Sequence, residues 1–574
     1  MYKSNLNPMF RSKFSEDIFN QKYKHERAET WEQLAETLVK DVNGTLDIYQ
    51  PGVIISNNDG HLSKTEEDQL IQYIKELKFI PGGRYLYYAG RKKKFFNNCF
   101  LLKSEKDTRE DWADLSWKAE SCLMTGGGIG NDYSVYRGKG HTLSQTGGLS
   151  SGPIPKMNMI NEIGRNVMQG GSRRSAIYAS LNWQHDDIDA FLVAKDWKNM
   201  MVGDTGKSLW DIKQNDFNFP AQLDMTNISV NYDTAWLKNY WNTGKVGEVF
   251  SKNVRQALET SEPGFSFNFF DKENETLRNA CTEVTSEDDS DVCNLGSINM
   301  GRIDNITEFI DIITLSTKFL LLGTLRADLP YDKVYETREK NRRLGLGLMG
   351  IHEWLIKKGY KYEVVPELKK WLKAYESQSD NVSRTYADQL GISRPVANRA
   401  IAPTGSIGIL AGTTTGIEPI FAVAYKRRYL TSGTKWKYQY VVDSAAQEMI
   451  DIYGVNPDEI ESALTLAEDY ERRIKFQADI QDFVDMSISS TINLPAWGST
   501  LNNEDTVEGF SNTLASYAHR LRGFTAYADG SRGGQPLTSV PYLEAKEKLG
   551  EVFEEGISTH DICVIGKGGE SGCN

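Results

Sequence analysis

Residues 279–283 read Asn-Ala-Cys-Thr-Glu, and a short acidic stretch separates them from Cys-Asn-Leu-Gly-Ser at residues 293–297. If the first segment is extended, its alternate side chains share one face. Asn279, Cys281 and Glu283 would then stand in a row, roughly 7 Å apart from one to the next. An amide, a thiol and a carboxylate in that order could hold a polyol, abstract hydrogen from it and deprotonate it. By itself the pattern is more typical of a polar strand edge with one incidental cysteine.

The amino-acid composition is that of an ordinary globular protein. The 574 residues are 25% charged and 39% hydrophobic, which is the usual profile of such proteins. The length suggests about three to five domains, or fewer large ones. The net charge of −12 argues against a non-specific nucleic-acid binder. No stretch approaches the ~20 apolar residues that cross a membrane, so we expect no membrane segment.

The six cysteines and the N-terminus point to a cytoplasmic protein. No apolar signal sequence follows Met1, and so few cysteines in 574 residues suggest reduced thiols. The sequence contains neither a C-x-x-C nor an H-E-x-x-H pattern, and we therefore expect no metal site.

The pattern along the chain is that of an α/β protein. Residues 1–95 are expected to be helical and polar, with a capping box at residues 63–66 and a helix stop at residues 81–84. Helices over residues 308–325 and 366–390 alternate with short apolar strands. The strands expected around this helical middle are residues 97–102, 341–347, 492–495 and 523–527.

Three glycine-rich or hydroxyl-rich segments suit phosphate binding. Glycines at residues 126–130 let backbone N–H groups approach an anion, although a plain helix-to-strand turn explains them equally well. Residues 169–174 (Gln-Gly-Gly-Ser-Arg-Arg) add two guanidinium groups to such freedom. Residues 402–408 place hydroxyls and free N–H groups at an expected helix start, which could also be an ordinary capped helix.

Taken together and in order, these motifs resemble one family along nearly the whole chain. The sequence is similar to the catalytic subunit of a ribonucleotide reductase, and most similar to its adenosylcobalamin-dependent (class II) branch, including phage-like members. Residues 81–84, 169–174, 425–430 and 524–532 carry the likeness to that branch. The resemblance implies an α/β fold, a ten-stranded α/β barrel with residues 279–283 on a finger loop in its centre. It also implies a helical region at 1–95, the catalytic barrel at 96–545 and a flexible redox-active tail at 546–574.

The resemblance also implies a role for each site residue. Cys281 would carry the thiyl radical, Glu283 would be the base on the ribose 3′ hydroxyl, and Asn279 would hold the sugar. Cys99 and Cys293 would supply electrons and end as a disulfide. The substrate would be bound by Asn98, Pro403, Thr404, Gly405, Ser406 and Ile407. The specificity loop would be Gln169, Gly170, Gly171, Ser172, Arg173 and Arg174, and the redox tail would carry Cys563 and Cys573.

The implied partners are small molecules and a reductant. They are a ribonucleoside di- or triphosphate as substrate, a deoxynucleoside triphosphate as allosteric effector, adenosylcobalamin, and a thioredoxin- or glutaredoxin-like protein; a homodimer is left open. Two features depart from the family pattern: nine residues separate the tail cysteines, and no ATP-cone region is recognisable.

Two other readings stay open at this point. The radical could come from a separate ferritin-like subunit, a route that usually places two adjacent tyrosines on a late barrel strand. Residues 524–527 read Phe-Thr-Ala-Tyr and hold one tyrosine, which favours cobalamin. A non-catalytic nucleotide-binding regulator on the same fold would be expected to have lost cysteines that this chain retains.

Overall fold

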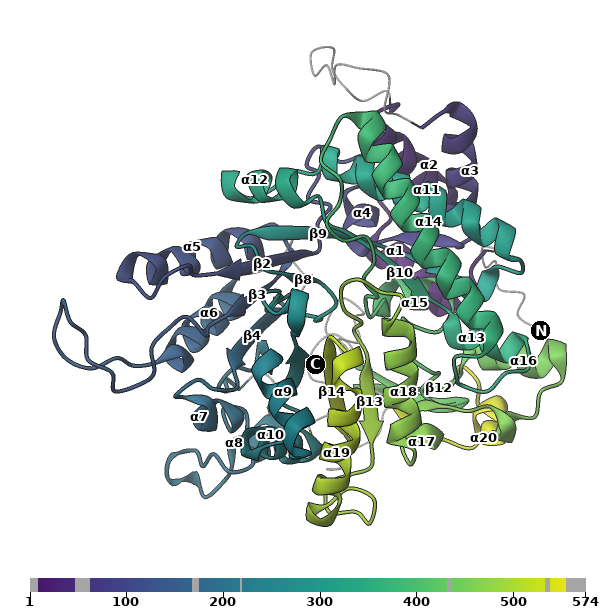
Figure 1. The fold of residues 1–574 in the computed structure, drawn as a ribbon. Helices are drawn as coiled ribbons and strands as arrows, with labels where there is room; N and C mark the ends of the chain where they lie inside the picture. The colour runs from purple at the N-terminus through teal and green to yellow at the C-terminus, as the bar shows by residue number, and fades with distance from the viewer. Residues whose placement is uncertain are drawn as a thin grey trace.

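A computed structural model describes residues 9–46, 62–167, 175–216, 219–430, 436–531 and 537–553. Its centre is a sheet of ten strands in the order β1-β9-β2-β3-β4-β5-β6-β14-β13, with β10 paired to β9. Helices surround this sheet, and the short hairpin that contains β8 lies in the middle of the ring of strands (Figure 1). The predicted ten-stranded α/β architecture is confirmed.

Five neighbouring strands form one half of the sheet, and all of them run parallel. They are β2 (Cys99–Lys103), β3 (Gly128–Asp132), β4 (Ile177–Asn182), β5 (Thr226–Tyr232) and β6 (Gly264–Phe267). Parallel neighbours need crossover connections, and helices supply them here. The first two crossovers contain α5 (Arg109–Met124) and α6 (Pro153–Asn166).

The second half contains β9 (Asp291–Asn299) parallel to β10 (Leu344–Met349), and β13 (Thr491–Leu494) parallel to β14 (Gly523–Ala528). The two halves meet in antiparallel pairs, β2 with β9 and β6 with β14. Among the described residues, no ladder of named strands joins β10 to β13. In that gap lie isolated parallel bridges, Leu346 with Arg399 and Ile401 with Ile488.

The helices expected from local periodicity are present. Residues predicted as helices at 308–325 and 366–390 form α11 (Ile306–Arg326) and α14 (Pro366–Leu390). The other helices are α1 (Lys13–Lys22), α2 (Trp31–Asn43), α3 (Lys64–Lys75), α4 (Gly83–Tyr88), α7 (Ile188–Leu192), α8 (Leu209–Asn215), α9 (Thr234–Thr243), α10 (Glu248–Thr260), α12 (Asp332–Asn341), α13 (Ile351–Lys357), α15 (Gly405–Ala411), α16 (Ser444–Tyr453), α17 (Ala463–Leu466), α18 (Tyr470–Gln481), α19 (Val507–Tyr517) and α20 (Tyr542–Glu547).

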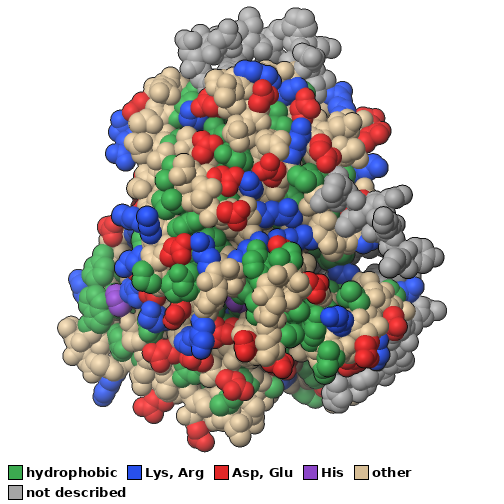
Figure 2. Space-filling view, turned by 90° about the vertical axis from the view of Figure 1, so that its right-hand side faces the viewer, with side chains coloured by type: hydrophobic (Ala, Val, Ile, Leu, Met, Phe, Trp, Pro, Cys, Tyr) green, Lys and Arg blue, Asp and Glu red, His purple; other side chains and the backbone are tan. Residues whose placement is uncertain are grey.

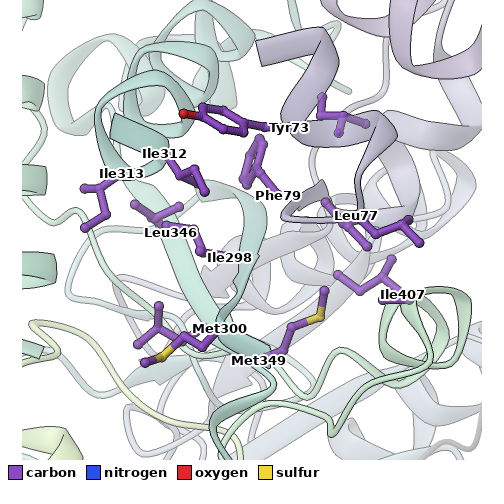
Figure 3. Close-up of a cluster of buried hydrophobic side chains, with 14 of the residues drawn as sticks. Tyr73, Leu77, Phe79, Ile298, Met300, Ile312, Ile313, Leu346, Met349 and Ile407 are labelled. Carbon is purple, nitrogen blue, oxygen red and sulfur yellow. The ribbon is translucent and has the colours of Figure 1, made fainter. Parts of the chain in front are cut away.

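The N-terminal region contributes a strand to the sheet as well as helices. Ser63 and Glu66 form the expected capping box of α3. Residues 79–81 were expected to belong to the helical region, at its helix stop of residues 81–84, but they form β1 (Phe79–Pro81), which pairs antiparallel with β9. Phe79 packs with Ile298 of β9, Leu346 of β10 and Ile312 of α11 in one buried apolar cluster (Figure 3). The helical region and the sheet therefore share a core.

A second, separate sheet has four strands. Its order is β15 (Leu537–Ser539), β11 (Ala424–Leu430), β12 (Trp436–Val442) and β16 (Val552–Phe553). The tail was expected to begin at residue 546, but residues 546–547 complete α20 and β16 pairs with β12. The tail at residues 546–574 stays a prediction, and both tail cysteines lie outside the described residues.

One face of the molecule intermixes charges of both signs. The face in Figure 2 carries Lys and Arg interspersed with Asp and Glu, and no large patch of one sign. None of the described helices is long and apolar enough to cross a membrane.

Candidate active site

Two very short strands carry the candidate catalytic residues. β7 (Leu277–Arg278) pairs antiparallel with β8 (Thr285–Ser286), and residues 279–284 form the tip of this hairpin. The Thr282 N–H donates to the Asn279 carbonyl over 3.0 Å, and Thr282 has a left-handed φ of 68°. The expectation of an extended segment is therefore wrong. Residues 279–283 turn because the hairpin must reverse direction within the barrel, and no local pattern announces that constraint.

The turn changes how the three side chains are arranged. It places Asn279 and Glu283 against each other, and the Asn279 Nδ2 donates to Glu283 Oε2 over 2.8 Å. The Asn279 Oδ1 accepts the Val284 N–H over 3.0 Å, which fixes the amide orientation. Both side chains are buried, whereas Cys281 at the tip is exposed.

Glycines in β3 allow the hairpin to approach the sheet closely. A Cβ on Gly130 would lie 1.7 Å from the Arg278 carbonyl oxygen, and one on Gly128 would lie 3.3 Å from the Ala280 Cβ. Of the roles considered for the 126–130 glycines, the helix-to-strand turn between α5 and β3 is present. The close contact with the hairpin is a further role that the sequence did not reveal.

A side chain and a backbone group from distant parts of the chain hold the tip. Asn227 of β5 donates from Nδ2 to the Ala280 carbonyl over 3.2 Å, and the Ser487 N–H donates to the Glu283 carbonyl over 2.9 Å. The tip is thus fixed on either side of Cys281. Sequence reasoning missed Asn227 and Ser487, because only the fold brings them to the hairpin.

A buried arginine anchors the root of the hairpin. The Arg278 guanidinium donates to Asn268 Oδ1 over 2.7 Å, to the Glu275 carbonyl over 2.6 Å and to the Arg522 carbonyl over 3.1 Å. Burial lowers the pKa of Arg278 to about 9. Neighbouring Arg522 pairs with the Glu275 carboxylate over 2.9 Å. These contacts tie the hairpin to β14, and no sequence motif marked Arg278.

The two buried thiols are neighbours across the junction of the half-sheets. Cys99 begins β2 and is the register partner of Cys293 in β9. Cys99 is 4% exposed and Cys293 is fully buried, and all four cysteines in the described ranges are unbridged. Burial raises the pKa of both thiols well above the usual range, and the charge of Glu283 adds to the effect. Both are therefore neutral thiols that carry protons.

The hairpin brings its carboxylate to this thiol pair. The Asn279 Nδ2 donates to Cys99 Sγ over 2.9 Å, and Cys99 Sγ lies 3.9 Å from Glu283 Oε1. Burial raises the pKa of Glu283 to about 7, while the hydrogen bond from Asn279 opposes that rise. Near neutral pH the carboxyl can accept a proton or release one, as a general acid–base group requires.

The predicted substrate-binding residues lie on segments that adjoin the thiols. Asn98 directly precedes Cys99, and a Cβ on Gly82 would lie 3.0 Å from the Asn98 Oδ1. Ala400 and Ala402 pack in the same apolar cluster as Cys99 and Cys293, and the chain then continues into Pro403 and α15.

The start of α15 has backbone N–H groups without a partner in the helix, beside two hydroxyls that are hydrogen-bonded. Its first internal hydrogen bond runs from the Gly408 N–H to the Thr404 carbonyl, so the N–H groups of residues 405–407 have no partner within the helix. The Thr404 Oγ1 accepts the Gly416 N–H over 2.8 Å, and Ser406 Oγ accepts from Lys22 Nζ over 3.0 Å. The helix start expected here is confirmed.

Some predicted residues cannot be placed. Gln169, Gly170, Gly171, Ser172, Arg173 and Arg174 lie outside the described residues, between α6 and β4, and Cys563 and Cys573 lie beyond the last described residue. Their roles stay predictions.

Comparisons with known proteins agree with this geometry. A family model described as "Ribonucleotide reductase, barrel domain" matches residues 97–373 and 391–527. The vitamin B12-dependent ribonucleoside-diphosphate reductase of Mycobacterium tuberculosis (strain CDC 1551 / Oshkosh) is 26% identical, over 89% of this chain and 78% of that protein. A protein of the same name from Thermoplasma acidophilum is 26% identical, over 84% of this chain and 68% of that protein.

Two further similarities concern a phage protein and a solved structure. The putative adenosylcobalamin-dependent ribonucleoside-triphosphate reductase of Mycobacterium phage D29 is 28% identical over 58% of this chain and 52% of its own length. The Actinobacillus ureae class Id ribonucleotide reductase alpha subunit has the same fold, with a TM-score of 0.67 and 16% identity over 90% of this chain and 97% of that one. Since the family match spans the hairpin, both buried thiols and the start of α15, the chain belongs to the ribonucleotide reductase family, as a catalytic subunit with its barrel domain.

Proposed function

We propose that this chain reduces ribonucleotides to 2′-deoxyribonucleotides by thiyl-radical chemistry, for DNA synthesis in the cytoplasm, with adenosylcobalamin as the radical source. The observation that carries the proposal is the buried cluster of Asn279, Glu283 and Cys99 beside Cys293, under a hairpin tip that exposes Cys281. It offers one accessible thiol, one carboxyl that titrates near neutrality and two buried thiols that can act as reductants.

The residues would share the reaction as follows. A thiyl radical at Cys281 takes the hydrogen atom from the ribose 3′ carbon and returns it at the end. Glu283 accepts the 3′ hydroxyl proton, and Asn279 holds that side of the sugar by hydrogen bonds. The apolar side chains of Leu277 and Met486 pack in one cluster with Cys99 and Cys293 and keep water away from these two thiols.

Cys99 and Cys293 would supply the reducing equivalents. The ribose C2′–O bond breaks and a C2′–H bond forms, the hydroxyl leaves as water, and the two thiols lose two hydrogen atoms as one S–S bond forms. The elevated pKa values of both thiols suit this role, because the protons that the reaction consumes are already on sulfur. Their adjacent register positions in β2 and β9 suit disulfide formation.

The accessible position of Cys281 fits a large external cofactor. Bound adenosylcobalamin supplies an organic radical by homolysis of its cobalt–carbon bond. Cys281 alone among the three active-site thiols is exposed, so only it can meet a group outside the barrel. Alternation along β14 puts Gly523, Thr525 and Tyr527 on one side, and Gly523 lies near Thr282 of the tip. Tyr527 and its register partner Asn493 are the residues that we expect to contact the cofactor.

The substrate we propose is a ribonucleoside diphosphate, with the triphosphate as the alternative. Residues 403–407 would bind its phosphates through N–H groups and hydroxyls, and Asn98 would contact the sugar side. The names of the relatives from M. tuberculosis and T. acidophilum, which match most of this chain, support the diphosphate.

Regulation and re-reduction would involve segments whose placement the structure does not describe. Residues 169–174 would transmit the identity of a deoxynucleoside triphosphate effector to the substrate site. Cys563 and Cys573 would pass electrons from a thioredoxin- or glutaredoxin-like protein to the buried pair. A homodimer would use α5 and α6, adjacent helices that expose Trp117, Met124 and Met159. The division at residues 95/96 and 545/546 stays a prediction.

Reduction by the isolated chain tests the proposal. We expect purified protein with CDP and dithiothreitol to form dCDP only when adenosylcobalamin is added, and the Cys281→Ser protein to form none. If the chain is inactive with cobalamin but active with a ferritin-like partner subunit, the cofactor assignment is wrong and the assignment as a ribonucleotide reductase still holds. Nucleotide binding without reduction under either condition would favour the non-catalytic regulator.

A further inference from the structure

A small cavity beside α19 has no part in the proposed reaction. Helices α10 and α18 both pack against α19, and α17 packs against β13 (Figure 1). Side chains from these elements, and from the turn Glu504–Thr506, enclose a cavity of about 50 Å³. Its apolar walls include Leu258 of α10, Leu494 of β13 and Phe510 of α19.

A buried amide in the cavity wall has an oxygen without a partner. Asn502 lines the cavity and is only 2% exposed. Its Nδ2 donates to the Leu258 carbonyl over 3.0 Å and to the Pro495 carbonyl over 2.8 Å. Both amide protons are therefore used, which fixes the orientation of the side chain. The Asn502 Oδ1 has no hydrogen-bond partner in the described part of the chain, and a buried acceptor in that condition favours a ligand that donates to it.

The other polar side chains of the lining also favour a donor. Glu468 is exposed and forms no ion pair within the described ranges. The Tyr470 ring is held against Phe510, with ring centroids 4.7 Å apart, and a tyrosine face attracts cations. The Thr506 hydroxyl is already engaged, because it donates to the Asn503 carbonyl over 2.8 Å. The lining contains no Lys, Arg or His.

The charges around the cavity are mostly negative. Four exposed carboxylates flank the lining residues in the sequence, and they are Asp469, Glu471, Asp505 and Glu508. Arg255 of α10 already pairs with Glu504 over 2.5 Å and with Glu259 over 2.9 Å. Arg472 of α18 pairs with Glu461 over 2.8 Å. A cationic ligand would therefore meet an attractive potential here.

We propose that this cavity binds a guanidinium group. One water needs roughly 10–15 Å³ of such space, so the cavity accommodates about four heavy atoms, the number in a guanidinium. That group is planar, presents N–H donors in a fork, stacks on aromatic rings and is less strongly hydrated than an ammonium. Asn502 Oδ1 accepts one N–H and the Glu468 carboxylate another, while the plane of the group lies along the Tyr470 ring.

The test is a set of binding titrations on the full chain by saturation-transfer NMR. Methylguanidine is the probe, methylurea has its shape without the charge, and methylammonium has the charge without the fork. We expect methylguanidine to bind with a Kd of roughly millimolar size, as suits so small a ligand. Methylurea and methylammonium should bind at least about fivefold more weakly, because each lacks one of the two features.

Two variants and a control locate the binding. Glu468→Gln should raise the Kd of methylguanidine about threefold, since an exposed ion pair contributes modestly. Ala467→Leu adds bulk to the cavity wall without changing charge, and it should abolish measurable binding. Glu120→Gln makes the same charge change at an exposed position on α5 and should leave the Kd unchanged. Asn502 is not replaced, because its amide also holds two backbone carbonyls.

A fourth ligand separates the two sources of a guanidinium, a small molecule and the arginine side chain of another protein. Blocked arginine, acetylated and amidated, should bind as well as methylguanidine if the cavity takes a side chain; binding of methylguanidine alone would assign it to a small molecule. Either result supports the site. No saturable binding of methylguanidine, equal binding of methylurea or methylammonium, or unchanged binding in Ala467→Leu would overturn it. None of these measurements depends on ribonucleotide reduction.

Discussion

The hydrogen bond between Asn279 and Glu283 offers a sharp test of the acid–base assignment. Asn279→Ala removes the amide that donates to Glu283 Oε2 over 2.8 Å. That hydrogen bond favours the ionised carboxylate, whereas burial favours the protonated form and raises the pKa of Glu283 to about 7. Without the amide the pKa must rise further.

The size of the rise follows from the strength of the bond. A buried hydrogen bond to a charged group contributes about 1.5–3 kcal/mol, and 1.36 kcal/mol corresponds to one pKa unit. We therefore expect the pKa of Glu283 to move up by about one to two units. At pH 7 the ionised fraction would fall from about half to between roughly a tenth and a hundredth.

The assay is the pH dependence of kcat/KM for CDP reduction between pH 5.5 and 9.5. In wild type the activity should rise with an inflection near pH 7, since the carboxylate is the active form. In Asn279→Ala the inflection should lie about one to two units higher, with a pH-independent loss on top because the amide also holds the sugar. Glu283→Gln should abolish the activity. An unchanged inflection in the Asn279→Ala protein would refute the assignment of this titration to Glu283.

Three further predictions concern the same hairpin. Cys281→Ser should abolish deoxynucleotide formation yet leave the melting temperature and CDP binding unchanged, because an O–H bond is too strong for the required hydrogen exchange; detectable product would contradict the thiyl assignment. Gly130→Ala should destabilise the fold by about 1–3 kcal/mol in urea unfolding and lower kcat, because its Cβ would lie 1.7 Å from the Arg278 carbonyl. Gly509→Ala is its control, since a Cβ there would meet nothing closer than 4.0 Å. If both substitutions changed the free energy of unfolding and kcat equally, the close contact at Gly130 would not explain the effect. Folding raises the pKa of Glu283 from 4.5 to about 7. Its contribution to the free energy of unfolding is therefore fully present below pH 4.5 and is lost as the pH rises through 7. The total loss is about 3 kcal/mol. Glu283→Gln should lack this decline between pH 5 and 8, and parallel curves for the two proteins would show that Glu283 is not the buried group that titrates.

Local periodicity was sufficient to predict several elements of the fold. The apolar spacing in residues 306–326 and 366–390 is set within a few turns of the chain, so α11 and α14 appear close to their expected bounds. The capping box of α3 is equally local. β1 was missed because its three residues, the last of which is the proline of a Pro-Gly-Gly sequence, are too few to show a period, and only the pairing with β9 makes them a strand.

The geometry of the active site could not be predicted from local sequence, because contacts between distant parts of the chain determine it. Residues 279–283 carry the right chemistry, but their turn depends on the β7–β8 pairing and on Thr282 in a left-handed conformation. Asn227 reaches the tip from β5, 53 residues away in the sequence. Arg278 and Lys22 each stand in ordinary polar sequence, and their partners become visible only when strands and helices from distant parts of the chain are brought together.

A single-turnover experiment tests the central claim most directly. The chain with both Cys563→Ser and Cys573→Ser is prereduced, freed of external thiol and mixed with CDP and adenosylcobalamin. We then count the dCDP formed per chain and map disulfides by peptide mass spectrometry. The account predicts about one dCDP per chain and a new disulfide between Cys99 and Cys293, the register partners of β2 and β9. Product formed while both thiols stay reduced, or a disulfide between other cysteines, would contradict it.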